Sequence, residues 1–376
     1  MKKKRVLFLF GTRPEAIKLA PVIKELEKYP NLFDIKICVT AQHRHMLDQV
    51  LDTFDIQPDF DFNIMQPNQT LFDINIRVLR DLEQLLARQK PDLVFVQGDT
   101  TTAFVAALAA YYKKIKIAHI EAGLRTEYKY APFPEEMNRR LLGALADFHF
   151  APTENAKQNL LHEGVLERNI LVTGNTVIDA LLMALRMDYQ FSPSILKQIK
   201  SGQKIILVTM HRRENFGEPL KRICQTLRLI IKRNQNVEII YPVHPNPNVS
   251  RPVRKLLDRT ERIHLIKPLD YLPFITLMKQ SYLILTDSGG IQEEAAALDK
   301  PVLILREKTE RPEALIAGVA RLVGSDAKKI IKETEKLLKS KMEYHRMVSA
   351  VNPFGDGKAA IRIRNFLLHC LSNNIF

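Results

Sequence analysis

The strongest constraint on the fold is the alternation of short apolar segments with segments of helical periodicity along the whole chain. Continuous apolar segments are typical of strands buried on both faces, and intervening helices indicate parallel pairing in α/β layers. So many strands favour two doubly wound domains over a single sheet. The predicted strands are 5–10, 34–40, 92–97, 115–121, 147–152, 170–174, 204–210, 237–243, 263–267, 282–286 and 301–305.

The length of 376 residues also supports two domains, since one domain typically has about 100–200 residues. Residues 174–204 hold a helix and then a connector with Ser, Pro and Gly before a new strand. We therefore predict an N-terminal Rossmann-like domain over 1–172 and a C-terminal one over 173–376. A Gly/Pro turn precedes the final amphipathic helix, about 357–376, which we expect to pack back on the N-terminal domain.

The charge of the chain bears on its partners. Of its residues 46% are hydrophobic and 26% charged, and 56 basic against 42 acidic residues give a net charge of +14. The Lys and Arg residues are spread along the chain without a block interleaved with aromatics, so a solvated face and a field that attracts phosphates explain the charge better than nucleic-acid binding. We expect no nucleic-acid partner.

Cysteine usage and the N-terminus indicate the compartment. Cys38, Cys224 and Cys370 lie far apart with no CxxC pair, which favours reduced, buried thiols over a disulfide framework or a zinc site. The apolar segment within 1–10 is followed at once by Gly-Thr-Arg-Pro-Glu, without a cleavage site of small residues. No segment approaches the ~18 apolar residues of a membrane span. We predict a cytoplasmic protein with no membrane partner.

Polar residues in the N-terminal half follow predicted strands, where open α/β sheets bind their ligands. Gly11 permits a tight turn after the first strand, with Arg13 on that turn and Lys18 one turn into the helix. Asp99 follows a later strand and precedes three threonines. The ordinary alternatives are a capped turn with a solvated Arg13, and an N-cap role for Asp99.

Further carboxylates follow other strands of the same half. Glu121 lies at a strand end, and Glu135 and Glu136 lie in the first turn of a helix that starts at Pro134. Acidic residues in a first turn complement the helix dipole, so each has an ordinary explanation. Together with Asp99, however, they place carboxylates at three βα junctions, which parallel strands bring to one edge.

The C-terminal half contributes cationic side chains. His211 follows a predicted strand beside two arginines, and His244 follows another. A lone histidine is more often structural than catalytic, but a histidine beside two arginines at a strand end is a functional candidate. Arg306 and Arg311 lie in the loop after the last predicted strand.

One stretch of this half, 284-ILTDSGGIQEEAAAL-298, predicts a phosphate site. Ser288, Gly289 and Gly290 open a helix whose first N–H groups and positive dipole end attract an anion, and the glycines leave room for it. Glu294, about one turn of 5.4 Å farther along, could accept hydrogen bonds from a ribose diol, which indicates a nucleotide. We expect Glu293 to face solvent or to pack locally.

Eight motifs along the chain stand out: GTRPEAIK at 11–18, QGDTTTA at 97–103, HIEAGLRT at 119–126, PEEMNRR at 134–140, HRRENFG at 211–217, DSGGIQEEA at 287–295, TERPEA at 309–314 and NPFGDGKA at 352–359. In this order the set resembles the non-hydrolysing UDP-N-acetylglucosamine 2-epimerases of bacteria. The resemblance runs from residue 5 to about 365, and it implies a GT-B fold with two Rossmann-like domains facing across a cleft, in a homodimer.

The resemblance also implies a reaction without a cofactor. UDP leaves C1 as the C2 proton is removed, and UDP adds back to 2-acetamidoglucal with protonation from the other face, which gives UDP-N-acetylmannosamine for cell-surface polysaccharides. By matching motifs, Asp99, Glu121 and Glu135 are the acid–base candidates and His211 assists the leaving diphosphate. The residues implied to hold UDP are Arg13, Lys18, His211, Phe274, Ser288, Gly289, Gly290, Glu294 and Arg311.

Many bacterial members of this family bind a second UDP-N-acetylglucosamine as an activator. The residues of this chain that match that region are Gln42, His43 and Gln69. The chain departs from the family at His45 and Asn68, and at Leu269 on the uracil side. Activation therefore stays a hypothesis.

Three alternatives to this function remain open. A GT-B glycosyltransferase with a UDP-sugar donor would share the nucleotide site but would need an acceptor pocket instead of three carboxylates around C2. A hydrolysing epimerase would differ in how well it excludes water. A nucleotide-binding regulator or nucleic-acid-binding protein is suggested only by the net charge of +14.

Overall fold

The computed structural model describes residues 3–40, 44–66, 69–126, 128–187, 199, 202–373 and 375, with only the backbone of 44–46. The chain forms two compact units: Met1–Ala184 together with Phe354–Phe376, and Leu185–Pro353. The sequence-based division after residue 172 lies before helix α7 (Thr176–Leu185), whereas the units divide at its end. The C-terminal segment returns to the first unit.

The first unit is built on a parallel sheet of seven strands in the order β3-β2-β1-β4-β5-β6-β7. This is the doubly wound Rossmann order, in which the direction of strand addition reverses between β1 and β4. The strands are β1 (Lys4–Phe10), β2 (Phe33–Val39), β3 (Phe60–Asp61), β4 (Leu93–Gln97), β5 (Lys116–Ile120), β6 (Phe148–Ala151) and β7 (Ile170–Val172).

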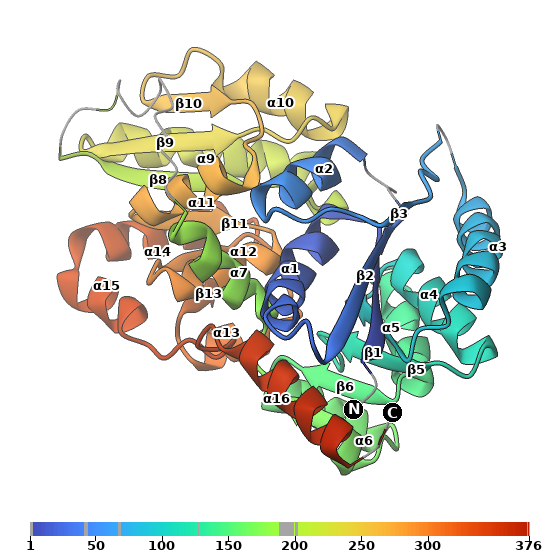
Figure 1. Cartoon of the computed structure of the whole chain (residues 1–376). Helices are drawn as coiled ribbons and strands as arrows, with labels where there is room; N and C mark the ends of the chain where they lie inside the picture. The colour runs from blue at the N-terminus through green and yellow to red at the C-terminus, as the bar shows by residue number, and fades with distance from the viewer. Residues whose placement is uncertain are drawn as a thin grey trace. The chain divides into compact units, whose positions relative to one another are not determined.

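Helices cover this sheet in two groups: α1 packs against α2 and α16, and α4 packs against α3 and α5 (Figure 1). Helices between parallel strands are expected from the right-handed crossover rule. Besides α7, the helices are α1 (Arg13–Glu27), α2 (Arg44–Thr53), α3 (Leu71–Gln89), α4 (Thr101–Tyr112), α5 (Glu135–Leu145), α6 (Glu154–His162) and α16 (Ala359–Ser372), and a 3-10 turn spans Glu167–Asn169.

The core of the first unit follows from the alternation of side chains along its strands. Leu7 and Leu9 of β1 join the cluster that also holds apolar residues of α3 and α4. Phe8 points to the other face and stacks on Phe95 of β4, with ring centroids 4.8 Å apart. On that face Phe366 of α16 meets the ring of Phe150 edge-on at 5.5 Å, so the final helix packs on the N-terminal sheet.

The second unit repeats the plan with six parallel strands in the order β10-β9-β8-β11-β12-β13, and the order reverses between β8 and β11. The strands are β8 (Lys204–Thr209), β9 (Val237–Pro242), β10 (Ile263–Ile266), β11 (Leu283–Thr286), β12 (Val302–Ile304) and β13 (Ala320–Leu322). The helices are α9 (Glu218–Arg233), α10 (Pro247–Leu257), α11 (Tyr271–Gln280), α12 (Gly289–Ala297), α13 (Pro312–Ile316), α14 (Ala327–Lys339) and α15 (Lys341–Val348), with a 3-10 turn at Arg213–Asn215.

Every strand predicted from the sequence is present, and two more were missed. The missed strands, β3 and β13, are the edges of their sheets and are only two and three residues long. Cys38, Cys224 and Cys370 are buried free thiols. Within the described residues no helix is long and apolar enough to cross a membrane, and no group of His, Cys, Asp and Glu is arranged to hold a metal ion.

Candidate functional site

In the first unit the strand order reverses between β1 and β4, so the turns after these strands border the crevice where a doubly wound sheet binds ligands. Thr100 caps α4, because its side chain accepts a hydrogen bond from the N–H of Ala103 at 3.0 Å. Asp99 is therefore not the N-cap, and that alternative is wrong. Its half-buried carboxylate is available for other contacts.

Asp99 is held by two residues of α5. Arg139 donates from Nε at 2.8 Å and from Nη2 at 2.6 Å to the same oxygen, Oδ2. Asn138 donates to the main-chain carbonyl of Asp99 at 2.9 Å. Arg139 and Asn138 are both buried, and a planar guanidinium fixes a carboxylate more firmly than a single donor would. This contact leaves Oδ1 of Asp99 without a hydrogen bond inside the described part of the chain.

A buried histidine supports the turn that carries Asp99. His119 of β5 lies 2.7 Å from the carbonyl oxygen of Gly98 through Nε2. Burial lowers the pKa of His119 to about 4, so the imidazole is neutral at physiological pH. Because the carbonyl can only accept, Nε2 carries the proton and donates it. Gly98 has a φ of +70°, a conformation that glycine adopts without strain.

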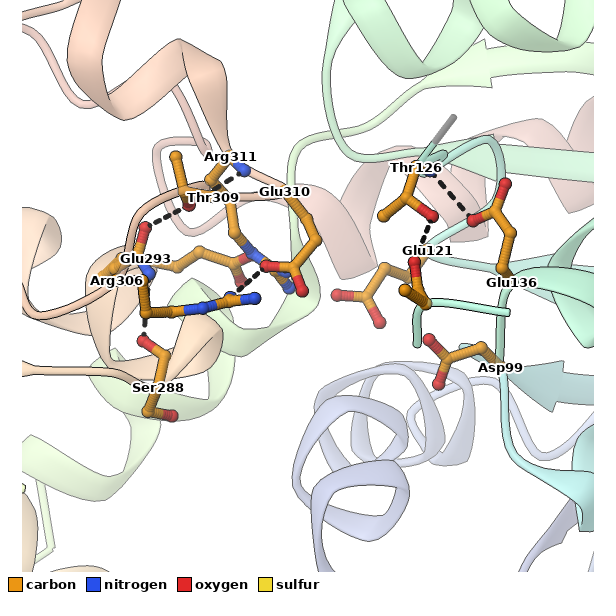
Figure 2. Close-up of polar contacts among 12 residues, drawn as sticks. Asp99, Glu121, Thr126, Glu136, Ser288, Glu293, Arg306, Thr309, Glu310 and Arg311 are labelled. Atoms are coloured by element: carbon orange, nitrogen blue, oxygen red, sulfur yellow. Dashed lines mark hydrogen bonds and ion pairs between the residues drawn. The ribbon is translucent and has the colours of Figure 1, made fainter. Parts of the chain in front are cut away.

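Glu121 lies directly after β5, which pairs with β4, so Glu121 and Asp99 follow adjacent strand ends (Figure 2). Its backbone is left-handed, with a φ of +64°, which is uncommon outside glycine and is often found at functional sites. Lys18 forms an ion pair with Oε1 at 2.5 Å, Asn175 donates to Oε1 at 3.0 Å, and Gln97 donates to Oε2 at 2.5 Å. These donors stabilise a negative charge on Glu121.

The two consecutive glutamates of α5 have different environments. Glu136 is fully buried and accepts the N–H of Thr126 at 2.8 Å (Figure 2). It also pairs with Arg139 at 3.3 Å, so it supports the residue that holds Asp99. Glu135 is half-buried and makes no hydrogen bond to any described residue. Of the two, Glu135 is the one free to act on a ligand.

Glu15 connects the two turns at the reversal point and was missed from the sequence. Its carboxylate accepts the N–H groups of Gly11 at 3.0 Å and Thr12 at 2.8 Å, and the hydroxyl of Thr100 at 2.6 Å. Burial raises the pKa of Glu15 to about 7, although these hydrogen bonds oppose the shift. The turn that carries Arg13 and the turn that carries Asp99 are thereby joined through one side chain.

In the second unit, α12 begins directly after β11 at the other reversal point. The N–H of Ser288 donates to the hydroxyl of Thr286 at 3.0 Å. The next amides, those of Gly289 and Gly290, belong to the first helical turn, where N–H groups have no partner within the helix. A side chain at Gly290 would meet no atom within 4 Å, so the approach to these amides is open.

Asp287 organises the loop of His211. It is fully buried and accepts the main-chain N–H of His211 at 3.1 Å and of Arg212 at 3.0 Å, and the amide of Asn215 at 2.9 Å. The imidazole Nδ1 of His211 lies 3.3 Å from the same carboxylate. Burial lowers the pKa of His211, and Asp287 opposes that shift. His244 stacks on His211 with ring centroids 5.9 Å apart.

The guanidinium of Arg311 packs closely against the start of α12. A Cβ atom added to Gly289 would lie 2.8 Å from its Nη1 and 2.9 Å from its Cζ, so a larger residue here would force the guanidinium to shift. Glu293 is buried and accepts from Nε of Arg311 at 2.7 Å. Of the two environments expected for Glu293, exposure to solvent is wrong and local packing is confirmed, because its carboxylate fixes the guanidinium. Nearby, Nη1 of Arg306 forms an ion pair with Oε2 of Glu310 at 2.6 Å (Figure 2).

The remaining candidates of this unit lie on α11 and α12. Glu294 is buried and accepts a hydrogen bond from the hydroxyl of Tyr271 at 3.1 Å. Phe274, one turn along α11 from Tyr271, is half-buried. These residue types suit a nucleoside, because a base can stack on an aromatic ring and a ribose can donate hydrogen bonds to a carboxylate.

Comparison with known proteins decides the family. The model of the UDP-N-acetylglucosamine 2-epimerase family matches residues 24–368. The chain belongs to this family of isomerases. It is 55% identical over 367 residues to the UDP-N-acetylglucosamine 2-epimerase of Salmonella typhimurium, covering 96% of this chain and 97% of that protein.

Solved structures of UDP-N-acetylglucosamine 2-epimerases have the same fold as this chain. The crystal structure of UDP-GlcNAc 2-epimerase from Neisseria meningitidis bound to UDP-GlcNAc has a TM-score of 0.90 and 49% identity, covering 97% of this chain and all of that one. The S. aureus MnaA–UDP co-structure has a TM-score of 0.91 and 46% identity, covering 98% and 97%. The two Rossmann-type units are thus those of the GT-B fold that the resemblance implied.

The epimerase fold places the predicted residues in two groups, one in each unit. Arg13, Lys18, Asp99, Glu121 and Glu135 belong to the first unit, and the other proposed UDP contacts belong to the second. For the activator region, Gln42 and His43 lie outside the described residues, as do Asn68 and the side chain of His45. The side chain of Gln69 accepts the N–H of Gln66 at 3.1 Å.

Sequence reasoning missed the residues that hold the candidates in place. They are buried polar residues whose role depends on a partner far along the chain, so the local sequence around them gives little indication of that role. Gln97 and Asp287, which lie inside the quoted motifs at strand ends, could have been found by asking which polar residues end a buried strand. The missed supports are Glu15, Gln97, His119, Asn138, Arg139, Asn175, Asn215 and Asp287.

Proposed function

We propose that this epimerase interconverts UDP-N-acetylglucosamine and UDP-N-acetylmannosamine without hydrolysis, by elimination of UDP and its re-addition to 2-acetamidoglucal. The observation that carries the proposal is the pair of carboxylates at adjacent strand ends, Asp99 and Glu121, each held by buried donors. Removing a proton from one face of C2 and returning it to the other needs two positioned acid–base groups. Glu135 is the third candidate, since it has no structural partner of its own among the described residues.

The leaving diphosphate is assigned to the second unit. The amides of Gly289 and Gly290 and the guanidinium of Arg311 offer positive charge to phosphate oxygens, and the proposed role of His211, which is held by Asp287, is to assist the leaving group. Glu294 would accept the ribose hydroxyls, with Phe274 near the uracil. Arg13 and Lys18 of the first unit complete the proposed set, although Lys18 is already engaged with Glu121.

The test is incubation with UDP-N-acetylglucosamine in deuterated water, followed by proton NMR. We expect the manno epimer with deuterium at C2. Free UDP with free N-acetylmannosamine would identify the hydrolysing reaction instead, and the absence of exchange would favour a glycosyltransferase. Asp99→Asn and Glu121→Gln should each lower turnover by ~10²-fold or more. Wild-type turnover in either variant would remove that residue from the mechanism.

We also propose a homodimer that acts in the cytoplasm on a precursor of cell-surface polysaccharides. Exposed apolar side chains on α3 and α4 support a second copy as partner: Phe72, Ile76 and Tyr112 are 79%, 58% and 63% exposed. Isolated exposed apolar residues are common, but a group on adjacent helices is typical of an interface. Light scattering of Phe72→Glu against wild type tests this: a dimer should become monomeric.

The proposed activation by a second UDP-N-acetylglucosamine has a separate test. If Gln42, His43 and Gln69 bind an activator, initial rates should rise sigmoidally with substrate, and Gln69→Ala should change the Hill coefficient while leaving the affinity for UDP at the second unit unaltered. A hyperbolic curve for the wild-type enzyme would exclude activation under those conditions.

A further inference from the structure

The motif 352-NPFGDGKA-359 has no role in the reaction proposed above, yet it is bound tightly to another segment of the first unit. The main-chain N–H of Asn175 donates to the carbonyl of Phe354 at 2.7 Å, and Arg362 donates to the carbonyl of Thr173 at 2.9 Å. Phe354 is 2% exposed. The segment before α7 and the segment before α16 are thus joined by hydrogen bonds from both sides.

Two glycines allow these segments to touch. Gly174 and Gly355 have φ values of +84° and +129°, which side-chain-bearing residues rarely adopt. A Cβ added to Gly174 would lie 3.1 Å from the Cα of Gly355, and one added to Gly355 would lie 3.2 Å from the Cα of Gly174. The two backbones therefore meet directly, and a larger residue at either position would push them apart.

Asp179 of α7 completes the junction. Its carboxylate accepts the N–H groups of Ala359 at 3.2 Å and Ala360 at 2.9 Å, at the first turn of α16. Carboxylates at a helix N-terminus also interact favourably with the dipole. The helices α7 and α16 are hence fixed to each other at their starts.

The junction lies within the first unit, close in sequence to both of the chain's connections to the second unit. The chain leaves the first unit after Ala184, at the end of α7, and returns at Phe354. Both passages are therefore continuous with the segments that are joined here.

The side chain of Asn175 extends from this junction to Glu121. Its Oδ1 accepts the N–H of Val177 at 3.0 Å, so the oxygen is assigned and the NH₂ group must face the other way. That group donates to Oε1 of Glu121 at 3.0 Å. Asn175 is 2% exposed, so solvent cannot replace it as a donor.

We propose that Asn175 is a positioning residue for Glu121, and that its hydrogen bond to Phe354 of the 352–359 motif holds it in place. The inference rests on the proton-transfer role proposed for Glu121. A carboxylate that takes a proton from carbon must be aligned with the C–H bond, and a displacement of about 1 Å can lower the rate ~10²-fold. The positive φ of Glu121 adds a reason for external support, because the local backbone does not favour this conformation.

Two substitutions separate positioning from a purely structural role. Asn175→Asp keeps the acceptor for Val177 and replaces the donor with a second carboxylate oxygen beside Glu121. Asn175→Ser keeps a capping hydroxyl but removes the donor without adding charge. Asn63→Asp, at an exposed turn of the same unit, is the matched control. Each variant is compared with the wild-type enzyme in kcat, KM, pH profile, melting temperature and calorimetric affinity for UDP.

We expect kcat to fall about 10- to 100-fold in both Asn175 variants, with KM and the affinity for UDP little changed. In Asn175→Asp the acidic limb of the kcat profile should also move to higher pH by ~1 unit or more, because a like charge disfavours ionisation of the pair. Asn175→Ser should show the loss of kcat without this movement. Asn63→Asp should behave as wild type.

Wild-type kcat and pH profile in both folded variants would overturn the inference. So would a loss of activity that follows the melting temperature alone, since that is the signature of a structural cap. Full activity of Glu121→Gln would instead overturn the proposed function, and the inference with it. Inactive Glu121→Gln beside fully active Asn175 variants would leave the proposed function standing and refute only the positioning role.

Discussion

Arg139 donates from two nitrogens to a single oxygen of Asp99, Nε at 2.8 Å and Nη2 at 2.6 Å to Oδ2. The usual paired geometry would engage both carboxylate oxygens. This arrangement fixes the carboxylate and leaves Oδ1 without a hydrogen bond among the described residues, as the proton transfer proposed for Asp99 requires. Glu136, on the same helix α5, pairs with this guanidinium. The helix therefore holds Arg139 in a fixed orientation.

Replacing Arg139 with Lys should keep the charge and lose the two-nitrogen contact. We expect kcat to fall by ~10-fold or more. The affinity for UDP should stay constant, because the residues proposed to hold the diphosphate belong to the other unit. Arg140→Lys is the matched control, since Arg140 contacts Glu136 at 3.3 Å and its side chain is about half exposed. Equal kcat values for the two variants would mean that the geometry at Oδ2 is unimportant.

Replacing Glu15 with Gln should change how stability depends on pH. Burial raises the pKa of Glu15 to about 7 in the folded protein, from an ordinary value of 4.5. Between these values the unfolded chain releases a proton that the folded protein keeps, so the free energy of unfolding falls as pH rises. Relative to Glu15→Gln, the wild-type protein should lose ~3 kcal/mol from pH 4.5 to 7.

Denaturant titrations at several pH values measure this difference. Glu27→Gln, at an exposed position of the same helix, is the control and should parallel the wild type. If the curves of Glu15→Gln and the wild type run parallel as well, Glu15 is ionised in the folded protein across this range.

Replacing each glycine of α12 with Ala should have opposite effects on stability. A methyl group at Gly289 would lie 2.8 Å from Nη1 of Arg311, so Gly289→Ala should lower the melting temperature. A methyl group at Gly290 would meet no atom within 4 Å, so Gly290→Ala should gain up to about 1 kcal/mol from helix propensity.

The more stable Gly290→Ala protein should nonetheless bind UDP more weakly, because its methyl group would occupy the approach to the proposed diphosphate amides. Isothermal titration calorimetry provides the comparison. Retention of wild-type affinity in this variant would show that no phosphate lies against that amide.

Replacing Glu294 with Ala should weaken UDP binding by ~10-fold, since hydrogen bonds to a charged group typically contribute about 1.5–3 kcal/mol. Tyr271→Phe is the matched comparison. It removes the 3.1 Å hydrogen bond to Glu294 but leaves the carboxylate, so the loss should be smaller. Calorimetry with UDP gives both values, and an unchanged affinity for Glu294→Ala would leave this residue with only a local structural role.

Much of the fold could be predicted from the sequence because its determinants are local. Buried parallel strands need continuous apolar segments, and β1, β4 and β11 have them, each followed by a turn with glycine within a few residues. The edge strands β3 and β13 could not be predicted, since strands of two or three residues carry no pattern of their own and form by pairing with a neighbour.

The sequence by itself determined two doubly wound units, the strand ends that carry the candidate residues, and the motifs of an epimerase. The tertiary structure alone decided which carboxylates are free and which are engaged: Glu135 is unbound within the described chain, while Glu136 is fully buried. It also joined Asn175 to Glu121 and to Phe354. The physical reason is that the state of a buried polar group depends on donors and acceptors from distant segments, which no local pattern in the sequence specifies.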